Sequence, residues 1–522
     1  MKKFPRTNGD KEVSNMVRFL LHHGANVNVP GRNGQLPIHY TCQNGYLDTT
    51  KSLIVNGAKV NHPDGNGRLP IHHACENEHL DLVELLLRTG ARLDVPDKDG
   101  RLPIHYACEK GHCDIVDLLI TSGAKEDVPD GDGRLPIHYA CAQEHLNLVE
   151  LLIRNGVNVN VPDKSRRRPI HYACEKGHSP VVNLLIKSGA KENVPDGDGR
   201  LPIHYACEKE LDLVELLIKN GAKMDVPDKD GRLPIHYACE KEHQGILKLL
   251  INNGAKIDVP DKYGRLPIHC VCATEHLDLV ELLIKNGAKV DVPDKNGRLP
   301  IHYACEKGHS VVVDLLIKSD VKLDVSDGSG RRPIHYACEN SHSNVVKILV
   351  ENSAKLEVTD QKRRLLIHYA SGNNYLDPLK LLMTHSVKMD APDEDGRRPI
   401  HYACEKGYLL TTSLLKTSGA KLDVVDKSHR LPIHYACQSG YLGVVKLLIA
   451  SGVALDVPDD NGWLPIHYAC EVGHLDTIKL LITSGSEVNV PDGDGRLPID
   501  HAREKGHLDC VNLLGENGAK SA

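Results

Sequence analysis

Residues 97–129, DKDGRLPIHYACEKGHCDIVDLLITSGAKEDVP, form one complete unit of a pattern that fills most of this 522-residue chain. Neighbouring copies are 33 residues apart, with a single step of 32. A fixed period of this length is typical of solenoids, in which every repeat is one supersecondary unit. The core hexapeptide Pro-Ile-His-Tyr-Ala-Cys, or a close variant, begins at Pro37, Pro70, Pro103, Pro136, Pro169, Pro202, Pro234, Pro267, Pro300, Pro333, Leu366, Pro399, Pro432, Pro465 and Pro498.

The residue types within this unit predict a turn followed by two short helices. Asp97 can accept hydrogen bonds from the backbone N–H groups that follow it, and Gly100 tolerates the positive φ of a turn. Pro103 suits the first position of a helix, because the N–H group that it lacks has no helical partner there. Apolar residues then recur at helical spacing in two segments, which end at Gly111 and Gly123. Neither helix can bury its apolar face alone, so the units must stack.

The unit resembles the ankyrin repeat. The shared pattern is D-x-x-G-x-x-P-I-H-x-A-C-x-x-G-H-x-x-x-V-x-L-L-I-x-x-G-A, and it extends over residues 14–522. The resemblance implies an all-α repeat solenoid of stacked antiparallel helix pairs, with β-hairpin fingers between units and a concave surface lined by fingers and first helices. It also implies a protein-recognition surface and no enzymatic activity, because ankyrin arrays as a family have none of their own.

One departure from the ankyrin pattern affects the motif histidine. The family has threonine before the motif proline, whereas this chain has leucine in most units and arginine at Arg168, Arg332 and Arg398. A histidine such as His105 therefore lacks its usual threonine partner, and the sequence does not show what replaces it.

The repeats define the domain organisation. At the start, Met16 and Phe19 belong to a second helix that has no recognisable first helix before it. Either the preceding residues cover this helix irregularly, which we favour because exposed apolar patches are uncommon on monomers, or its face is available to a partner. At the end, Asp500, Arg503 and Gly515 make the last unit more polar, as a terminal repeat requires. We expect an N-terminal tail or irregular cap, a half repeat, an ankyrin array and a capping repeat at residues 1–13, 14–30, 31–491 and 492–522.

Two irregularities predict local differences in stability and stacking. Three consecutive units have Asp320, Ser353 and Ser386 in place of the capping glycine, and a non-glycine residue in the left-handed region costs about 1 kcal/mol. We therefore expect residues 318–390 to be the least stable part of the array. The 32-residue step, between Glu210 and Leu211, should alter the stacking locally.

Composition excludes several classes of function. A net charge of -6 over 522 residues gives no overall field that would attract nucleic acid. No secretory signal and no apolar run of about 20 residues is found, so we expect a cytoplasmic protein without membrane insertion, and a nuclear location stays open. Thirteen of the sixteen cysteines occupy one slot of the repeat, which indicates small buried apolar sites with reduced thiols.

No motif for a cofactor, a metal or catalysis stands out. Cys108 and His112 have zinc-like spacing, but helical periodicity directs the cysteine into the core while the histidine lies at a turn. Residues 130–133 lack the order of acidic residues of a calcium loop. Neither a phosphate-binding loop nor a nucleophile motif is present, so we expect no cofactor and no enzyme.

Two residue columns are the candidates for protein binding. Arginine and tyrosine are enriched at interface hot spots, and Trp463 occupies an arginine slot as the only tryptophan. Alternatively, acidic neighbours such as Asp99 and Glu109 pair with Arg101, and the columns are structural. The arginines follow the turn glycine at Arg68, Arg101, Arg134, Arg167, Arg200, Arg232, Arg265, Arg298, Arg331, Arg364, Arg397, Arg430 and Arg496. The tyrosines lie on the first helices at Tyr106, Tyr139, Tyr172, Tyr205, Tyr237, Tyr303, Tyr336, Tyr369, Tyr402, Tyr435 and Tyr468.

The sequence thus favours a scaffold or adaptor that binds unidentified proteins on its concave face, with acidic or extended segments against the two columns. A structural or elastic spacer is the alternative. The targeting arm of a modular enzyme is a third possibility, but no residues outside the repeats are left for an enzyme domain.

Overall fold

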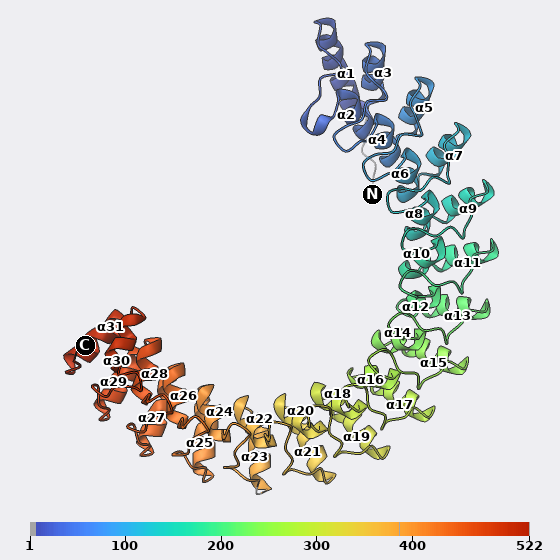
Figure 1. The fold of residues 1–522 in the computed structure, drawn as a ribbon. Helices are drawn as coiled ribbons and strands as arrows, with labels where there is room; N and C mark the ends of the chain where they lie inside the picture. The colour runs from blue at the N-terminus through green and yellow to red at the C-terminus, as the bar shows by residue number, and fades with distance from the viewer. Residues whose placement is uncertain (1–6, 386, 521–522) are drawn as a thin grey trace. The chain divides into compact units, whose positions relative to one another are not determined.

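Paired helices follow one another throughout the described part of the chain (Figure 1). In this computed structural model, which describes residues 7–385 and 387–520, the chain forms two compact units that divide between Lys262 and Tyr263. Within each unit, the first helices of successive repeats form one row and the second helices form another. This arrangement confirms the expected all-α stack of helix pairs.

In the first unit, residues 7–262 contain seven helix pairs, and the second helix of a half repeat comes before them. The first helices are α2 (Pro37–Asn44), α4 (Pro70–Glu76), α6 (Pro103–Lys110), α8 (Pro136–Ala142), α10 (Pro169–Lys176), α12 (Pro202–Ala206) and α14 (Pro234–Glu240). The second helices are α1 (Thr7–His22), α3 (Leu47–Val55), α5 (Leu80–Arg88), α7 (Cys113–Thr121), α9 (Leu146–Arg154), α11 (Ser179–Lys187), α13 (Leu211–Lys219) and α15 (Gln244–Asn252). A 3-10 turn, η1 (Arg32–Gly34), precedes α2.

The described residues of the second unit form eight helix pairs. Its first helices are α16 (Pro267–Cys272), α18 (Pro300–Lys307), α20 (Pro333–Glu339), α22 (Leu366–Gly372), α24 (Pro399–Glu405), α26 (Pro432–Ser439), α28 (Pro465–Val472) and α30 (Pro498–Glu504). Its second helices are α17 (Leu277–Lys285), α19 (Ser310–Lys318), α21 (Ser343–Glu351), α23 (Leu376–Thr384), α25 (Leu409–Thr417), α27 (Leu442–Ala450), α29 (Leu475–Thr483) and α31 (Leu508–Glu516).

The core lies between the two helix rows and is built from small and branched apolar side chains. In one repeat, α6 packs against α7, and Ile104 and Cys108 of α6 and Val116 and Leu119 of α7 are all buried. The thirteen cysteines of the repeat slot are buried and free of disulfides, as expected. Burial raises the pKa of one of these thiols, Cys42, to about 12, so the slot is chemically inert and serves packing.

The segments between repeats are stacked turns and not β-hairpins, which corrects one expectation. Among the described residues the only β-pairing is an isolated bridge between Thr359 and Leu365. Two features explain this result. The turn carboxylate of Asp97 accepts the N–H groups of Asp99 and Arg101 at 3.0 and 2.8 Å, which satisfies the backbone locally. Proline, which cannot donate to a ladder, precedes this aspartate in most repeats.

The left-handed turn positions keep their conformation even where glycine is missing. Gly123 has a φ of 93°, and Asp320 and Ser353 take the same position with φ of 59° and 67°. Arg363, at the turn-glycine slot, has a φ of 58°. Ser386 lies outside the described residues. The low stability of residues 318–390 stays a prediction, now supported by three strained positions.

The missing residue between Glu210 and Leu211 shortens a first helix. α12 has five residues, whereas α10, in the preceding repeat, has eight. In most repeats a histidine before the second helix reaches back to the preceding repeat, as His145 Nε2 does to the Glu109 carbonyl oxygen at 3.1 Å. Glu210 occupies this position after α12, so the contact is absent there and the expected local change is confirmed.

The N-terminal end of the described chain is helical. α1 begins at Thr7, so residues 7–13 are helical and continuous with the half repeat; residues 1–6 lie outside the described part. Asp10 anchors this helix on α3 by accepting the N–H of Asp48 at 3.0 Å. Met16 and Phe19 are 62% and 60% exposed, so residues 9–13 do not cover them.

Candidate protein-binding surface

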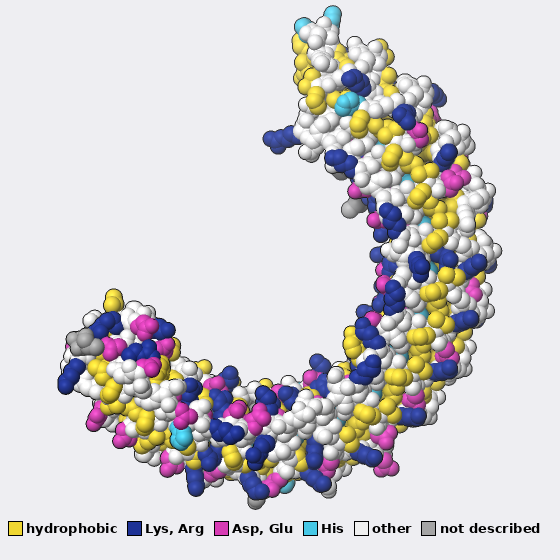
Figure 2. All heavy atoms as spheres, viewed as in Figure 1, with side chains coloured by type: hydrophobic (Ala, Val, Ile, Leu, Met, Phe, Trp, Pro, Cys, Tyr) yellow, Lys and Arg dark blue, Asp and Glu magenta, His cyan; other side chains and the backbone are white. Residues whose placement is uncertain are grey.

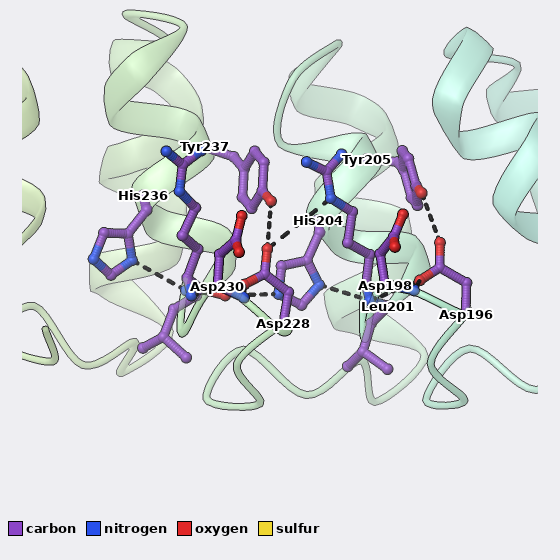
Figure 3. Close-up of polar contacts among 12 residues, drawn as sticks. Asp196, Asp198, Leu201, His204, Tyr205, Asp228, Asp230, His236 and Tyr237 are labelled. Carbon is purple, nitrogen blue, oxygen red and sulfur yellow. Dashed lines mark hydrogen bonds and ion pairs between the residues drawn. The ribbon is translucent and has the colours of Figure 1, made fainter. Parts of the chain in front are cut away.

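The motif histidines are buried, and most of them tie their repeat to the next; the Nε2 atoms of His302, His335 and His434 have no hydrogen-bond partner. His204 Nδ1 accepts the N–H of Leu201 at 2.9 Å, and its Nε2 contacts the carbonyl oxygen of Arg232 in the following repeat at 3.2 Å (Figure 3). Backbone groups therefore replace the missing threonine. Burial lowers the pKa of His204 to about 4, so the ring is neutral at pH 7, with an acceptor at Nδ1 and a donor at Nε2.

Most of the tyrosine column is part of the interior, and Tyr303 and Tyr402 are half-buried. Figure 3 shows Tyr205 and Tyr237 pointing at Asp196 and Asp228 of their own turns, to whose carboxylates they donate at 2.6 and 2.5 Å. Both rings are at most 4% exposed. Burial and the equivalent aspartate raise the pKa of Tyr172 to about 12, so the hydroxyl stays protonated and donates.

The turn aspartate that accepts Tyr139, Asp130, remains ionised. Burial alone would raise the pKa of Asp130, but the hydrogen bond from Tyr139 and those from the backbone N–H groups of Arg134 and Asp132 hold it below its usual value. In most repeats the first residue of the turn motif thus does two things, since it closes the turn and holds the tyrosine of the adjoining helix. Asp64 and Asp492 hold His73 and His501 instead.

The arginines lie between successive tyrosines at the surface edge of this network. The guanidinium group of Arg101 is 5.5 Å from the ring centroid of Tyr106 and 4.6 Å from that of Tyr139, in the next repeat. Its Nη1 donates to Glu109 Oε2 at 3.0 Å. Cation–π contacts of this kind are worth about 0.5–1 kcal/mol at exposed sites. The column therefore contributes to stacking as well as to surface charge.

The predicted site residues differ in how much surface they offer. Tyr106, Tyr139, Tyr205 and Tyr237 are buried, which supports their structural interpretation. The arginines that pair with glutamates are half-buried, with 17–29% of the side chain exposed in Arg101, Arg167, Arg200, Arg232 and Arg298. Arg134 is more open, at 35%. Arg265 lies 5.2 Å from the ring centroid of Tyr263.

Trp463 forms an aromatic cluster that no other arginine slot has. Its ring centroid is 5.0 Å from that of Tyr468 and 4.5 Å from that of His501, which replaces tyrosine in the last repeat. His501 contacts Asp492 Oδ2 at 2.8 Å and Glu471 Oε2 at 3.2 Å. Trp463 is partly exposed, and a role in binding stays a prediction.

The geometry of the titratable groups offers no metal site in the described residues, where no three His, Cys, Asp or Glu side chains lie close enough to hold an ion. Cys108 is buried, and His112 instead contacts the carbonyl oxygen of Glu76 at 3.2 Å. No helix in the described part combines the length and the apolar character needed to cross a membrane.

Sequence reasoning missed two features of this surface. It did not pair the turn aspartate with the tyrosine nine residues later. It also did not compare the residues that lie eight positions after each arginine of the column. Most repeats have glutamate there, but Ala142, Ala273, Gly372 and Gln438 break the column. Aligning the repeats at this position would have found the breaks.

Comparison with known proteins agrees with the fold. A family model described as ankyrin repeats (3 copies) matches the chain at residues 38–130, 104–196, 176–261, 203–294, 268–360, 366–459 and 433–521. The chain belongs to the ankyrin repeat family. Ankyrin repeats generally act as protein–protein interaction modules, and their architecture is typically non-catalytic. A search of curated proteins finds no match.

Proposed function

We propose that this ankyrin array is a non-catalytic adaptor that binds protein partners on the side formed by the turns and first helices. The observation that carries the proposal is the arginine column, whose guanidinium groups are rigidly held and partly open to solvent. Figure 2 shows Lys and Arg side chains gathered along this edge of the first unit. Pre-oriented guanidinium groups suit carboxylates, so acidic or extended segments are the proposed partners.

We infer that the array works in the cytoplasm or nucleus. Thirteen buried free thiols support this location, because thiols persist in reducing compartments. The elastic spacer is the alternative function. It is favoured because most arginines of the column pair with a glutamate of their own repeat.

Charge reversal at two arginines of the column tests the proposed adaptor function. The double variant Arg200→Glu/Arg232→Glu should lose captured partners in quantitative affinity-capture mass spectrometry. The matched control, Arg88→Glu/Arg154→Glu, changes two exposed arginines of the second helices and should keep them. Circular dichroism spectra must show that both variants are folded. If the wild type and both folded variants capture the same partners, binding through the arginine column is contradicted and the spacer function remains.

A further inference from the structure

The surface arginines are normally neutralised by a glutamate of their own repeat. This glutamate lies eight residues later, on the first helix, and faces the guanidinium group across the turn. In the first unit the Nη1–Oε distances are 3.0 Å for Arg68–Glu76, 3.0 Å for Arg101–Glu109, 3.1 Å for Arg167–Glu175, 3.6 Å for Arg200–Glu208 and 3.0 Å for Arg232–Glu240.

Arg134 is the exception in the first unit, because Ala142 stands where the glutamate would be. A cleft of about 160 Å³ opens at this place, and it is lined by Arg134, Ala142, Gln143, Tyr139 and Tyr172 together with Arg101, Glu109 and His138. Since a water molecule takes about 30 Å³ of liquid, the cleft has room for a carboxyl group and its methylenes. The glutamate in this lining is paired with Arg101, so it is not a free opposing charge.

The charge of Arg134 is poorly compensated. Its Nε donates to the hydroxyl of Tyr172 at 3.0 Å, and its ion pair with Asp132 is 3.8 Å long to a carboxylate that is 72% exposed. The next turn adds further positive charge, because Ser165 replaces the acidic residue found at Asp132. Arg166 also replaces the turn glycine, with a φ of 60°.

A second gap in the glutamate column shows that an empty slot alone does not leave a free cation. Gly372 replaces the glutamate of Arg364, and a cleft of about 170 Å³ opens there as well. Arg364 instead turns back to its own turn aspartate, with Nε and Nη2 at 2.9 and 2.8 Å from Asp360 Oδ2. Arg134 does not turn back in this way: its Nε donates to Tyr172 in the next repeat, and its ion pair is the long one to Asp132.

We propose that the cleft at Arg134 receives the carboxylate of an aspartate or glutamate side chain from an acidic segment of a partner protein. That carboxylate takes the place which the repeat's own glutamate takes beside the other arginines. A charge-assisted hydrogen bond to a pre-oriented guanidinium group is the expected contact. A larger cleft on the other side of Arg134, of about 320 Å³, is lined by Asp196 and Asp198 and is less suited to an anion. This inference rests on the proposed adaptor function.

The proposal can be tested with a substitution that matches the neighbouring repeats, because the missing glutamate can be restored. Ala142→Glu should fill the cleft with an internal carboxylate, and Ala142→Gln fills it with a neutral side chain of the same size. The probe is a fluorescein-labelled acetyl-(Gly-Glu)4-amide peptide, and its glutamine analogue is the reference. Fluorescence anisotropy should show that the wild type binds the acidic peptide more tightly than the reference.

The affinities of the two variants then show whether the peptide binds at the Arg134 cleft. Ala142→Glu should weaken binding of the acidic peptide about tenfold, the effect of losing one charge-assisted hydrogen bond, whereas Ala142→Gln should change it less than about twofold. Ala142→Glu reproduces the sequence of neighbouring repeats, so its thermal midpoint should not fall. Equal affinity of both variants for the acidic peptide, or no preference of the wild type for it, would overturn the proposal.

Failure of this site is distinguishable from failure of the adaptor function. If Ala142→Glu keeps both peptide affinity and its captured partners while Arg200→Glu/Arg232→Glu loses those partners, the adaptor stands and the Arg134 site is overturned. If Arg200→Glu/Arg232→Glu keeps every partner but Ala142→Glu loses peptide binding, the Arg134 site stands and binding along the rest of the arginine column does not.

Discussion

Acidification should destabilise the array through its motif histidines, and the size of the effect follows from their burial. Burial lowers the pKa of His105 to about 4, from the ordinary value of 6.5. Above pH 6.5 the ring is neutral in both the folded and the unfolded chain. Between pH 6.5 and 4 only the unfolded chain binds the proton, so stability falls as the pH falls. The same direction and value hold for His72, His171, His204, His302, His335, His401, His434 and His467.

The magnitude is large for a single repeat. One pKa unit corresponds to about 1.4 kcal/mol, so the 1.5 units between pH 6.5 and 5 cost about 2 kcal/mol for every repeat that unfolds. The full shift of about 2.5 units costs about 3 kcal/mol by pH 4. Turn aspartates such as Asp130, whose pKa is lowered, lose their contribution in a more acidic window, as the pH falls below the ordinary value of 3.8. The range from pH 7 to 5 therefore isolates the histidines.

Urea unfolding followed by circular dichroism at pH 7, 6 and 5 measures this effect. The midpoint should fall steadily below pH 6.5. His105→Gln, which keeps a side-chain acceptor but does not titrate, should lower the stability at pH 7 and reduce the pH dependence of its own repeat, as read from hydrogen exchange of α6 and α7. An unfolding midpoint that is constant from pH 7 to 5 would refute the reasoning, as would an unchanged pH dependence in this variant.

Three substitutions test other parts of the network. Tyr237→Phe leaves the buried carboxylate of Asp228 without its 2.5 Å hydrogen bond, so the free energy of unfolding in urea should fall by about 1–3 kcal/mol; no change would show that water replaces the hydroxyl. Ser353→Gly relieves a left-handed residue and should raise stability by about 1 kcal/mol, and hydrogen exchange should be faster in residues 318–390 than elsewhere, which uniform protection would disprove. Cys141→Ser buries a hydroxyl in the apolar slot and should lower the melting temperature, whereas Cys113→Ser, at a partly exposed site, should not.

The fold could be predicted in detail because residues within each repeat determine where its helices begin and end. Pro103 and Gly111 mark the two ends of α6, and the buried slot of Cys108 follows from helical spacing. The β-hairpins were expected because the resemblance implies them, whereas the described residues form stacked turns, which the prolines and self-capping aspartates of this chain favour. The partner of His105 could not be predicted, because it is a backbone carbonyl in the following repeat.

The candidate site was less predictable than the fold. The tyrosines occupy a helix position that could face either solvent or the turn, and only the packing of Arg68 and Asp97 around Tyr106 shows that it is buried. Ala142 is visible in the sequence as a substitution, but one alanine among many differences carries no meaning until its place beside Arg134 is known. The distinction between a paired and an open arginine depends on distances between repeats.

Hydrogen exchange of the array with and without a captured partner tests most directly whether the turn and first-helix side is the binding surface. Protection on binding should centre on the turn amides and first helices of the first unit, including residues 130–143 around Arg134. Protection confined to the second helices, such as α7 and α9, with unchanged exchange in the turns, would contradict the account.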